Sequence, residues 1–249
     1  MWERLEVDET LPVEDSVLLV ALSTMVPQYR ELYSHAKEFA RFLLRKVEFR
    51  KFASLYSSSL PPEVGIEDDG LARLRSNQFY SHAGKRRIIL LAGDGSPFDD
   101  QPQYAHSVLS FARQLGAKEM ISIGARWSES PIPPGAFLKP VGFATDVAGV
   151  KELEGLGVTI TKSEPGPFFP NLIVGMAEGY GMRGYKLGVD HGEPMPHPKS
   201  LIQITGVVSK MLGLDIDLKE LVARAKDLDR VKPQEGVPEV ARERSGIYG

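Results

Sequence analysis

The sequence predicts an α/β protein built as a three-layer α/β/α sandwich, with helices on both faces of a mostly parallel sheet. The first observation is residues 86–124, where an apolar run at 88–92 ends in a glycine turn, an amphipathic stretch follows, and a second apolar run covers 120–123. Strand, glycine turn, helix and strand in this order are typical of a parallel βαβ unit. The second observation is that both strands are apolar throughout, which indicates burial on both faces.

The composition limits the classes of protein to consider. The chain has 249 residues, of which 42% are hydrophobic and 25% charged, as expected for one large globular domain with an arm or tail. Its net charge of -3 argues against a nucleic-acid partner. The N-terminus has no apolar signal core and no apolar run is long enough to span a membrane, so we expect a cytoplasmic protein. The absence of cysteine excludes disulfides and thiolate chemistry.

The first elements follow from local patterns. Residues 1–15 are acidic and polar, and we expect them to form an N-terminal arm or a short edge structure. The apolar run 17–22 predicts the first buried strand. A helical stripe follows, and Pro27 suits the first turn of that helix. The stripe consists of Leu32, Ala36, Phe39, Ala40, Leu43 and Val47. Before the central unit we expect a strand at 49–56 and a hairpin-like insertion of short strands within 63–81.

The chain after residue 124 begins with a long irregular segment at 125–138. A loop of this length in a compact domain is usually functional or interfacial. Asp146 is placed to cap a short helix. From Lys232 onward the apolar periodicity fails, so we expect a single domain at 16–231 and a mobile tail at 232–249. The remaining expected elements are strands at 141–145, 157–161 and 185–189, and helices at 172–179, before Gly213 and from Asp217.

One strand-end loop, at residues 93–97, has two interpretations. It follows the carboxyl end of a parallel strand, where ligands bind in open α/β sheets, and a helix N-terminus there could hold an anion. Its spacing matches neither a dinucleotide fingerprint nor a P-loop, and the Asp94 carboxylate would repel a phosphate. These features favour a tight strand-to-helix turn.

A second strand-end loop contains Asp190, His191 and Glu193, with His197 nearby. These side chains could bind a metal or carry out acid–base chemistry, but neighbouring prolines make the segment stiff and no partner residues are evident. None of the possible serine nucleophiles lies in a Gly-x-Ser-x-Gly elbow: Ser96, Ser128 and Ser130. The residues therefore indicate no catalytic set, metal site or cofactor, while a small-molecule enzyme such as a nucleoside phosphorylase or hydrolase stays open as the alternative.

Four aromatic residues lie in or beside the two long loops: Trp127, Phe137, Phe168 and Phe169. Packed inward, they would form a hydrophobic cap over the sheet edge. Exposed, they would form a contact patch for another subunit or partner. Both interpretations stay open.

The C-terminus reads Ile247, Tyr248 and Gly249. A hydrophobic residue, a tyrosine and a free carboxylate at the end of a mobile tail form a compact docking element. The tyrosine supplies rigid contact area and a hydroxyl group, and the carboxylate can pair with a lysine in a pocket.

Several short motifs occur in an order that resembles the proteasome-assembly-chaperone family, particularly its archaeal members and their bacterial relatives. The motifs lie at 90–94, 111–119, 123–124, 141–146, 153–158, 196–198 and 212–221, so that the resemblance covers about residues 15–230. One departure is the sequence at 23–27, Ser-Thr-Met-Val-Pro, where many relatives have a glycine-rich turn.

The resemblance implies a purine-phosphorylase-like α/β/α sandwich without established enzymatic activity. Family members form homo-oligomers and bind subunits of the proteasome core particle, and some dock between α-ring subunits through a C-terminal hydrophobic–tyrosine–any-residue motif. Ile247, Tyr248 and Gly249 match that motif position by position. We therefore expect a non-enzymatic, homo-oligomeric proteasome assembly chaperone or activator that binds α subunits.

Overall fold

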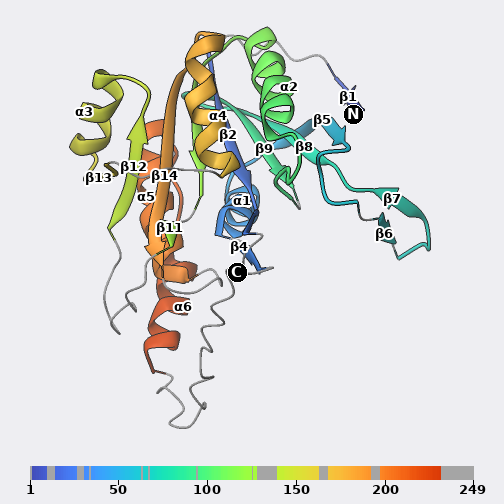
Figure 1. Ribbon diagram of the computed structural model, residues 1–249. Helices are drawn as coiled ribbons and strands as arrows, with labels where there is room; N and C mark the ends of the chain where they lie inside the picture. The colour runs from blue at the N-terminus through green and yellow to red at the C-terminus, as the bar shows by residue number, and fades with distance from the viewer. Residues whose placement is uncertain are drawn as a thin grey trace, which may run out of the picture.

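A large β-sheet runs through the middle of the protein, with helices on both of its faces (Figure 1). The computed structural model describes residues 2–9, 15–26, 31–33, 35–62, 64–66, 68–93, 95–124, 126–127, 139–162, 168–191 and 197–230. Within these residues the sheet has ten strands, and two short hairpins lie outside it. The arrangement confirms the predicted layered α/β architecture.

The secondary-structure elements follow one another as the apolar patterns indicate. The sheet strands are β1 Glu3–Val7, β2 Ser16–Leu22, β5 Arg50–Ser57, β8 Asn77–Ala83, β9 Arg87–Gly93, β10 Ala117–Ile123, β11 Arg126–Trp127, β12 Pro140–Ala144, β13 Thr159–Ile160 and β14 Arg183–His191. The hairpins are β3 Thr24–Val26 with β4 Glu31–Tyr33, and β6 Val64–Ile66 with β7 Ala72–Leu74. The helices are α1 His35–Lys46, α2 Gln101–Gln114, α3 Val147–Gly155, α4 Phe169–Ala177, the 3-10 turn η1 Glu178–Tyr180, α5 Pro198–Leu212 and α6 Lys219–Arg230.

The sheet is parallel at its centre, antiparallel pairs flank the centre on both sides, and the edge pair β12 and β13 is parallel again. Its order is β1-β5-β8-β9-β2-β10-β14-β12-β13, with β11 also beside β14. The four central strands β9, β2, β10 and β14 are parallel neighbours, as the βαβ pattern predicts. The antiparallel pairs join β8 to β9, β5 to β8, β1 to β5 and β12 to β14. The chain therefore forms a mixed sheet around a parallel core.

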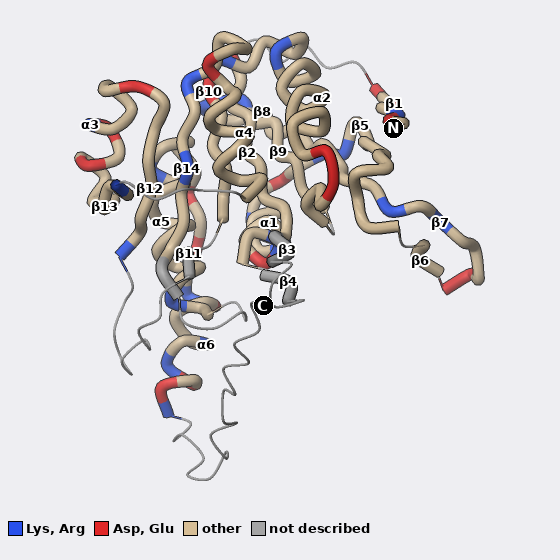
Figure 2. Tube along the Cα trace, in the orientation of Figure 1, with Lys and Arg blue, Asp and Glu red and all other residues tan. Residues whose placement is uncertain are grey.

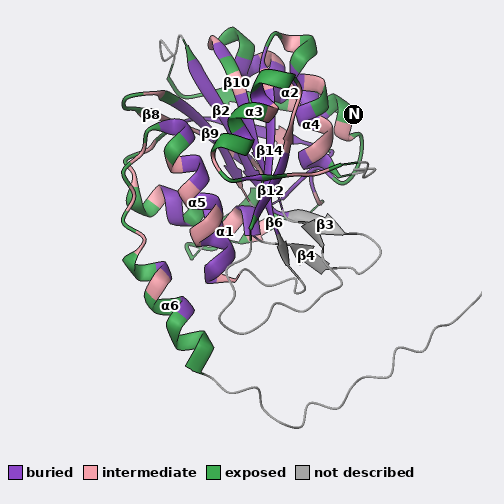
Figure 3. Cartoon of the chain, turned by 90° about the vertical axis from the view of Figure 1, so that its left-hand side faces the viewer, coloured by how far each residue is buried: buried purple, intermediate pink, exposed green. Residues whose placement is uncertain are grey.

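The central strand β2 is buried along its whole length, which explains its unbroken apolar sequence. Val17, Leu19 and Ala21 belong to one apolar cluster, together with residues of α1 and α5. The alternating side chains, which include Leu18 and Val20, belong to a second cluster with residues of α2 and α4. Figure 3 shows the buried strands between these helices. Because both faces are covered, every side chain of β2 must be compatible with a core.

Asp146 caps α3 as the sequence predicts. The amide of Gly149 donates to the Asp146 carboxylate at 2.6 Å, and the Arg183 side chain donates to the other carboxylate oxygen at 2.7 Å. The Gly149 amide and then the Arg183 guanidinium hold the pKa of Asp146 below its usual value. This cap fixes the start of the helix beside the end of β12.

The start of α1 differs from the prediction. The helix begins at His35, so the expectation that Pro27 lies in its first turn is wrong. Residues of β3 and β4 instead pair antiparallel, with Leu32 opposite Met25 in the register, so that Leu32 lies in an extended strand and not on the helix. At the N-terminus, β1 pairs with β5 and forms one edge of the sheet, which fits the expected edge structure.

Charged residues of both signs are spread over the described elements (Figure 2). The net charge of the chain is -3, which does not favour binding to nucleic acid. None of the helices in the described ranges has the length and apolar character that crossing a membrane requires.

Candidate functional site

The last described helix, α6, leads into the C-terminal residues. Ile247, Tyr248 and Gly249 lie outside the described residues, so their docking role stays a prediction. In Figure 3, α6 extends beyond the helices that cover the sheet, and most of its surface is exposed. Only Leu221 and Ala225 of this helix are buried. Its position therefore depends on polar contacts in addition to this small apolar face.

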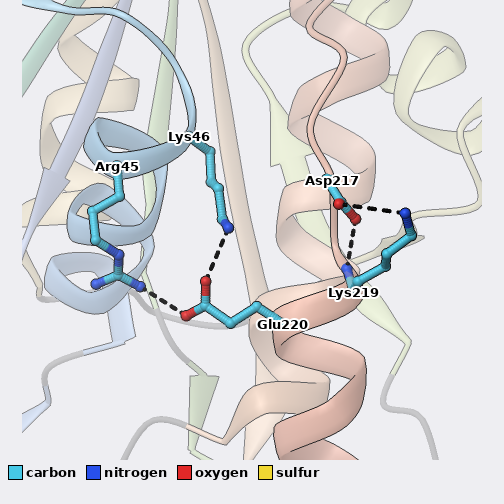
Figure 4. Close-up of polar contacts among 5 residues, drawn as sticks. All are labelled: Arg45, Lys46, Asp217, Lys219 and Glu220. Atoms are coloured by element: carbon cyan, nitrogen blue, oxygen red, sulfur yellow. Dashed lines mark hydrogen bonds and ion pairs between the residues drawn. The ribbon is translucent and has the colours of Figure 1, made fainter.

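Glu220 connects the first turn of α6 to the end of α1 (Figure 4). Its carboxylate accepts a hydrogen bond from Arg45 at 3.2 Å and pairs with Lys46 at 3.0 Å. These contacts, that of Lys46 first, hold the pKa of Glu220 below its usual value. Just before the helix, Asp217 accepts a hydrogen bond from the Lys219 amide at 2.9 Å. Both acidic groups also lie near the helix N-terminus, where negative charge is favourable.

A second ion pair holds the other end of α6. The side chain of Lys199, in the first turn of α5, is buried and lies 2.5 Å from the carboxylate of Asp229. Pairing with Asp229 compensates for the removal of the lysine charge from water. Since α6 is tied to α1 at its start and to α5 near its end, the chain enters the C-terminal residues from a defined point.

The four aromatic candidates have different outcomes. Phe169 is 1% exposed and packs edge-on against Tyr104, with ring centroids 5.6 Å apart, so it lies in the core and offers no contact surface. Phe168, at the N-cap of α4, is 37% exposed and remains available to a partner. The backbone of Trp127 lies in β11, while its side chain and the whole of Phe137 lie outside the described residues.

The described part of the 93–97 loop forms a turn held by buried polar groups. The Asn77 side chain donates hydrogen bonds to the Gly95 carbonyl at 2.9 Å and to the Tyr104 hydroxyl at 2.6 Å. A Cβ atom at Gly93 would lie 2.0 Å from Asn77 Oδ1, so Asn77 occupies the space that a side chain there would need. Burial raises the pKa of Tyr104 and keeps its hydroxyl neutral. The contacts fit the interpretation as a turn, although Asp94 itself is outside the described residues.

Asp190 and His191, which the sequence places in the second strand-end loop, lie in β14 beside the short strand β11. In the parallel pairing of β11 with β14, Arg126 is opposite Asp190 and Trp127 is opposite His191. The side chains of Asp190 and His191 are outside the described set, as are Glu193, Ser128 and Ser130. His197 accepts a hydrogen bond from the Lys199 amide at 3.2 Å and caps α5. The described residues bring together no group of three His, Asp or Glu side chains that could hold a metal.

Lys186, in the middle of β14, is a feature that sequence reasoning missed. Its side chain is buried, and among the described residues its ammonium group donates a hydrogen bond to the Leu187 carbonyl at 3.1 Å. No carboxylate among the described residues pairs with it. Burial lowers the pKa of Lys186 to about 8. The signal was present, because this lysine is the one charged residue in the apolar segment 185–189.

The buried lysine makes stability depend on pH. Its pKa is about 8 in the folded protein against 10.5 in the unfolded chain, so the unfolded chain binds more protons between these values. The free energy of unfolding should therefore rise from pH 8 to pH 10.5, by up to about 3 kcal/mol. Urea unfolding of the native protein and of Lys186→Met at pH 7 to 10 isolates this contribution. Parallel pH profiles of the two proteins would contradict the assignment.

A small pocket between β1 and α2 is a second feature absent from the sequence analysis. It has a volume of about 310 Å³, with Leu55, Phe79 and Phe111 among its lining residues. Glu3 crosses it, accepting hydrogen bonds from Ser57 at 3.1 Å and from Ser107. These hydrogen bonds attach the edge strand β1 to α2. The polar groups in the pocket therefore have a structural role.

Comparison with solved structures shows relatives of the same fold. PbaB of Pyrococcus furiosus, an archaeal proteasome activator, has a TM-score of 0.78 at 22% identity, covering 91% of this chain and 96% of its own. PbaA of the same organism, an archaeal homologue of proteasome-assembly chaperone, has a TM-score of 0.71 at 20% identity, covering 91% and 93%. A proteasome-assembly chaperone homologue of Mycobacterium tuberculosis has a TM-score of 0.69 at 16% identity, covering 86% and 92%.

The family comparison extends this likeness to the sequence. A search of curated proteins gave no match. The model of the PAC2 family, in contrast, matches residues 36–234, which is most of the chain. The matched range begins within α1, ends after α6, and includes the three central strands β9, β10 and β14. The match confirms the resemblance that the ordered motifs indicate, and the chain belongs to the PAC2 family.

Proposed function

We propose that this protein is a non-enzymatic proteasome assembly chaperone or activator that docks on the α-ring of the core particle through its C-terminal residues. The proposal rests on the combination of the fold with the sequence of the C-terminus. A fold similar to that of an archaeal proteasome activator over 91% of the chain is joined to a terminus that reads Ile247, Tyr248 and Gly249. The proposal places the protein in the cytoplasm, where the core particle is found.

The chemistry of the terminus suits insertion into a narrow pocket between subunits. Ile247 supplies apolar area, Tyr248 a rigid ring with a hydroxyl group, and Gly249 a carboxylate that is not shielded by a side chain. The ion pairs of α6 support this role, because they define the point from which the terminal residues start. No catalytic step is needed, since binding alone would bias assembly or opening of the ring.

Homo-oligomerisation forms part of the proposal. A single three-residue contact is weak, but several identical termini on one oligomer can engage several pockets of one ring, and the effective concentration after the first contact strengthens the rest. Phe168 is exposed and, among the described residues, is our candidate for a contact with another subunit or partner. We extend the same role to Trp127 and Phe137, which belong to the segment 125–138 that the sequence predicts to be a long loop.

A pull-down of purified core particle tests the proposal. The full chain and a variant that ends at Gly246 are compared at equal concentration. Retention by the full chain alone is expected, because the variant lacks only the docking residues. Retention by both would place the interface on the folded domain, and retention by neither would remove the proteasome as the partner. The mass of the free protein, from light scattering, tests the oligomer separately.

A further inference from the structure

The strand β1 lies at one edge of the large sheet, next to β5 (Figure 1). In the described part of the chain it is the outermost strand on this side, so its second edge has no neighbouring strand there. Four of its five residues are exposed, among them Leu5 at 39% and Val7 at 46%. An exposed strand edge with apolar side chains is a template for pairing with a further strand.

The hydrogen bonds to β5 determine which backbone groups of β1 point outward. The Asp8 amide donates to the Phe52 carbonyl of β5 at 2.8 Å, and the register between the two strands is unbroken. Hydrogen-bonded and non-hydrogen-bonded pairs alternate in an antiparallel ladder, so the even-numbered residues of β1 bond to β5. The amides and carbonyls of Glu3, Leu5 and Val7 therefore point away from the sheet.

The charge pattern of β1 is self-complementary when two copies pair antiparallel about Leu5. Outward-facing residues then lie opposite outward-facing residues, so the two strands can exchange backbone hydrogen bonds. Arg4 lies opposite Glu6 of the second copy, and Glu6 lies opposite its Arg4. Both are non-hydrogen-bonded positions, where facing side chains come closest, and opposite charges there stabilise the pairing.

Other registers of the same pairing place like charges opposite each other. A shift that preserves the backbone hydrogen bonds moves the centre of the pair from Leu5 to Arg4 or to Glu6, because outward-facing residues alternate along the strand. Two arginines or two glutamates would then face each other across the centre, which is destabilising. The order of charges in β1 therefore favours the register about Leu5 over its neighbours.

Contacts within one chain hold β1 in the conformation that such pairing needs. Glu3 accepts hydrogen bonds from Ser57 of β5 at 3.1 Å and from Ser107 of α2, which attach the strand to the domain. Arg4 and Glu6 lie on the same face of the strand and pair with each other at 3.1 Å. Because the strand is already formed, pairing costs little further conformational freedom.

We propose that two copies of this chain pair through the outer edges of β1, antiparallel about Leu5, so that their large sheets join into one. The contact is two-fold symmetric, and each copy contributes the same residues. This inference builds on the homo-oligomer of the proposed function, for which it names an interface, but it does not involve the C-terminal residues. A two-fold contact joins two equal units, so its loss should halve the mass of the assembly.

Charge reversal tests the interface with the untagged full chain. Arg4→Glu and Glu6→Arg each place like charges opposite each other at both symmetric positions, and each should raise the Kd of association by about tenfold. Sedimentation over a concentration series measures this Kd, and the mass should halve between the native and the variant Kd. Lys118→Glu changes the charge of an exposed residue of β10 by the same amount and should leave the mass unchanged.

Mixing the two variants in equal amounts should restore the native mass. The carboxylates of one chain then face the guanidinium groups of the other at both positions. Within each chain residues 4 and 6 still carry like charges, so mixing cannot repair a defect that lies inside one strand. Recovery on mixing therefore reports contact between two β1 strands.

Leu5→Pro tests the backbone part of the pairing. It removes the outward-facing amide, a substitution that an edge strand tolerates, and the loss of two symmetric hydrogen bonds should raise the Kd of association by about 30-fold. Native mass in both charge variants at every concentration would overturn pairing through β1 and leave a homo-oligomer built on another surface. A monomeric native protein would overturn both the pairing and the homo-oligomer, while the pull-down of core particle still tests the C-terminal docking separately.

Discussion

Tyr248→Ala is expected to lower the affinity of the oligomer for the core particle by at least about 100-fold. A buried tyrosine at the centre of an interface commonly contributes 2 kcal/mol or more, which is about 30-fold for a single contact. The loss is larger for several linked termini, because each subsequent contact depends on the preceding one. Tyr248→Phe keeps the ring and loses only the hydroxyl, so a smaller loss of about tenfold is expected.

Surface binding to immobilised core particle measures these affinities. Arg244→Ala is the matched control, because it changes the same terminal segment without touching the docking residues. All three variants should unfold at the same temperature as the native protein, since no described core contact involves them. An affinity of Tyr248→Ala equal to that of the native protein would exclude the tyrosine from the interface.

Gly142→Ala should destabilise the fold by about 3–5 kcal/mol, the range of severe packing errors. Gly142 lies in β12, where it faces Leu187 of the antiparallel neighbour β14. A Cβ there would lie 2.2 Å from the Lys186 carbonyl oxygen, which is backbone and has no rotamer with which to move away. The strands would have to separate, with loss of ladder hydrogen bonds at this edge of the sheet.

Gly206→Ala is the control: it makes the same substitution at a position where the opposite effect on stability is expected. Gly206 lies inside α5, and a Cβ there would meet no atom within 4 Å. Alanine is favoured over glycine in a helix interior by about 1 kcal/mol, so this variant should be more stable than the native protein. Urea unfolding gives both values. Changes of the same sign in the two variants would show that the described contacts at Gly142 do not determine its stability.

The centre of the fold could be predicted because the apolar runs of its sequence indicate buried strands. The runs at 17–22, 88–92 and 120–123 are apolar at every position or nearly so, and only a strand covered on both faces accommodates such a sequence at this length. Glycine turns and the Asp146 cap then mark where the helices begin and end. These signals are local, so they can be read without knowledge of the partner strands.

The position of Leu32, which was predicted wrongly, and that of Phe169, which the sequence left open, depend on contacts between distant residues. Leu32 continues the helical spacing of the α1 stripe, yet it pairs with Met25 in a hairpin, and nothing in the stripe itself reveals this pairing. Phe169 follows a rigid proline loop that is typical of a surface segment. Its burial depends on Tyr104 of α2, which is remote in the sequence.

The candidate sites were predictable to different extents. The terminal motif is visible in the sequence and gains meaning from the family resemblance, but its contacts involve another protein. Lys186 is visible as a charge within an apolar strand. Its environment, however, is assembled from Gly124 on one strand end, Pro170 on a helix and Ser122 on a neighbouring strand. The tertiary structure, and not the local sequence pattern, defines this environment.

The most direct test of tail docking is photo-crosslinking from position 248. Tyr248 is replaced by benzoylphenylalanine, the full chain is mixed with core particle and irradiated, and the adducts are identified by mass spectrometry. Benzoylphenylalanine at Phe168, on the folded domain, serves as the comparison. Adducts from position 248 on α subunits are expected, because the motif is proposed to insert between them. Adducts from position 168 alone, or adducts only within the oligomer, would contradict docking through the C-terminus.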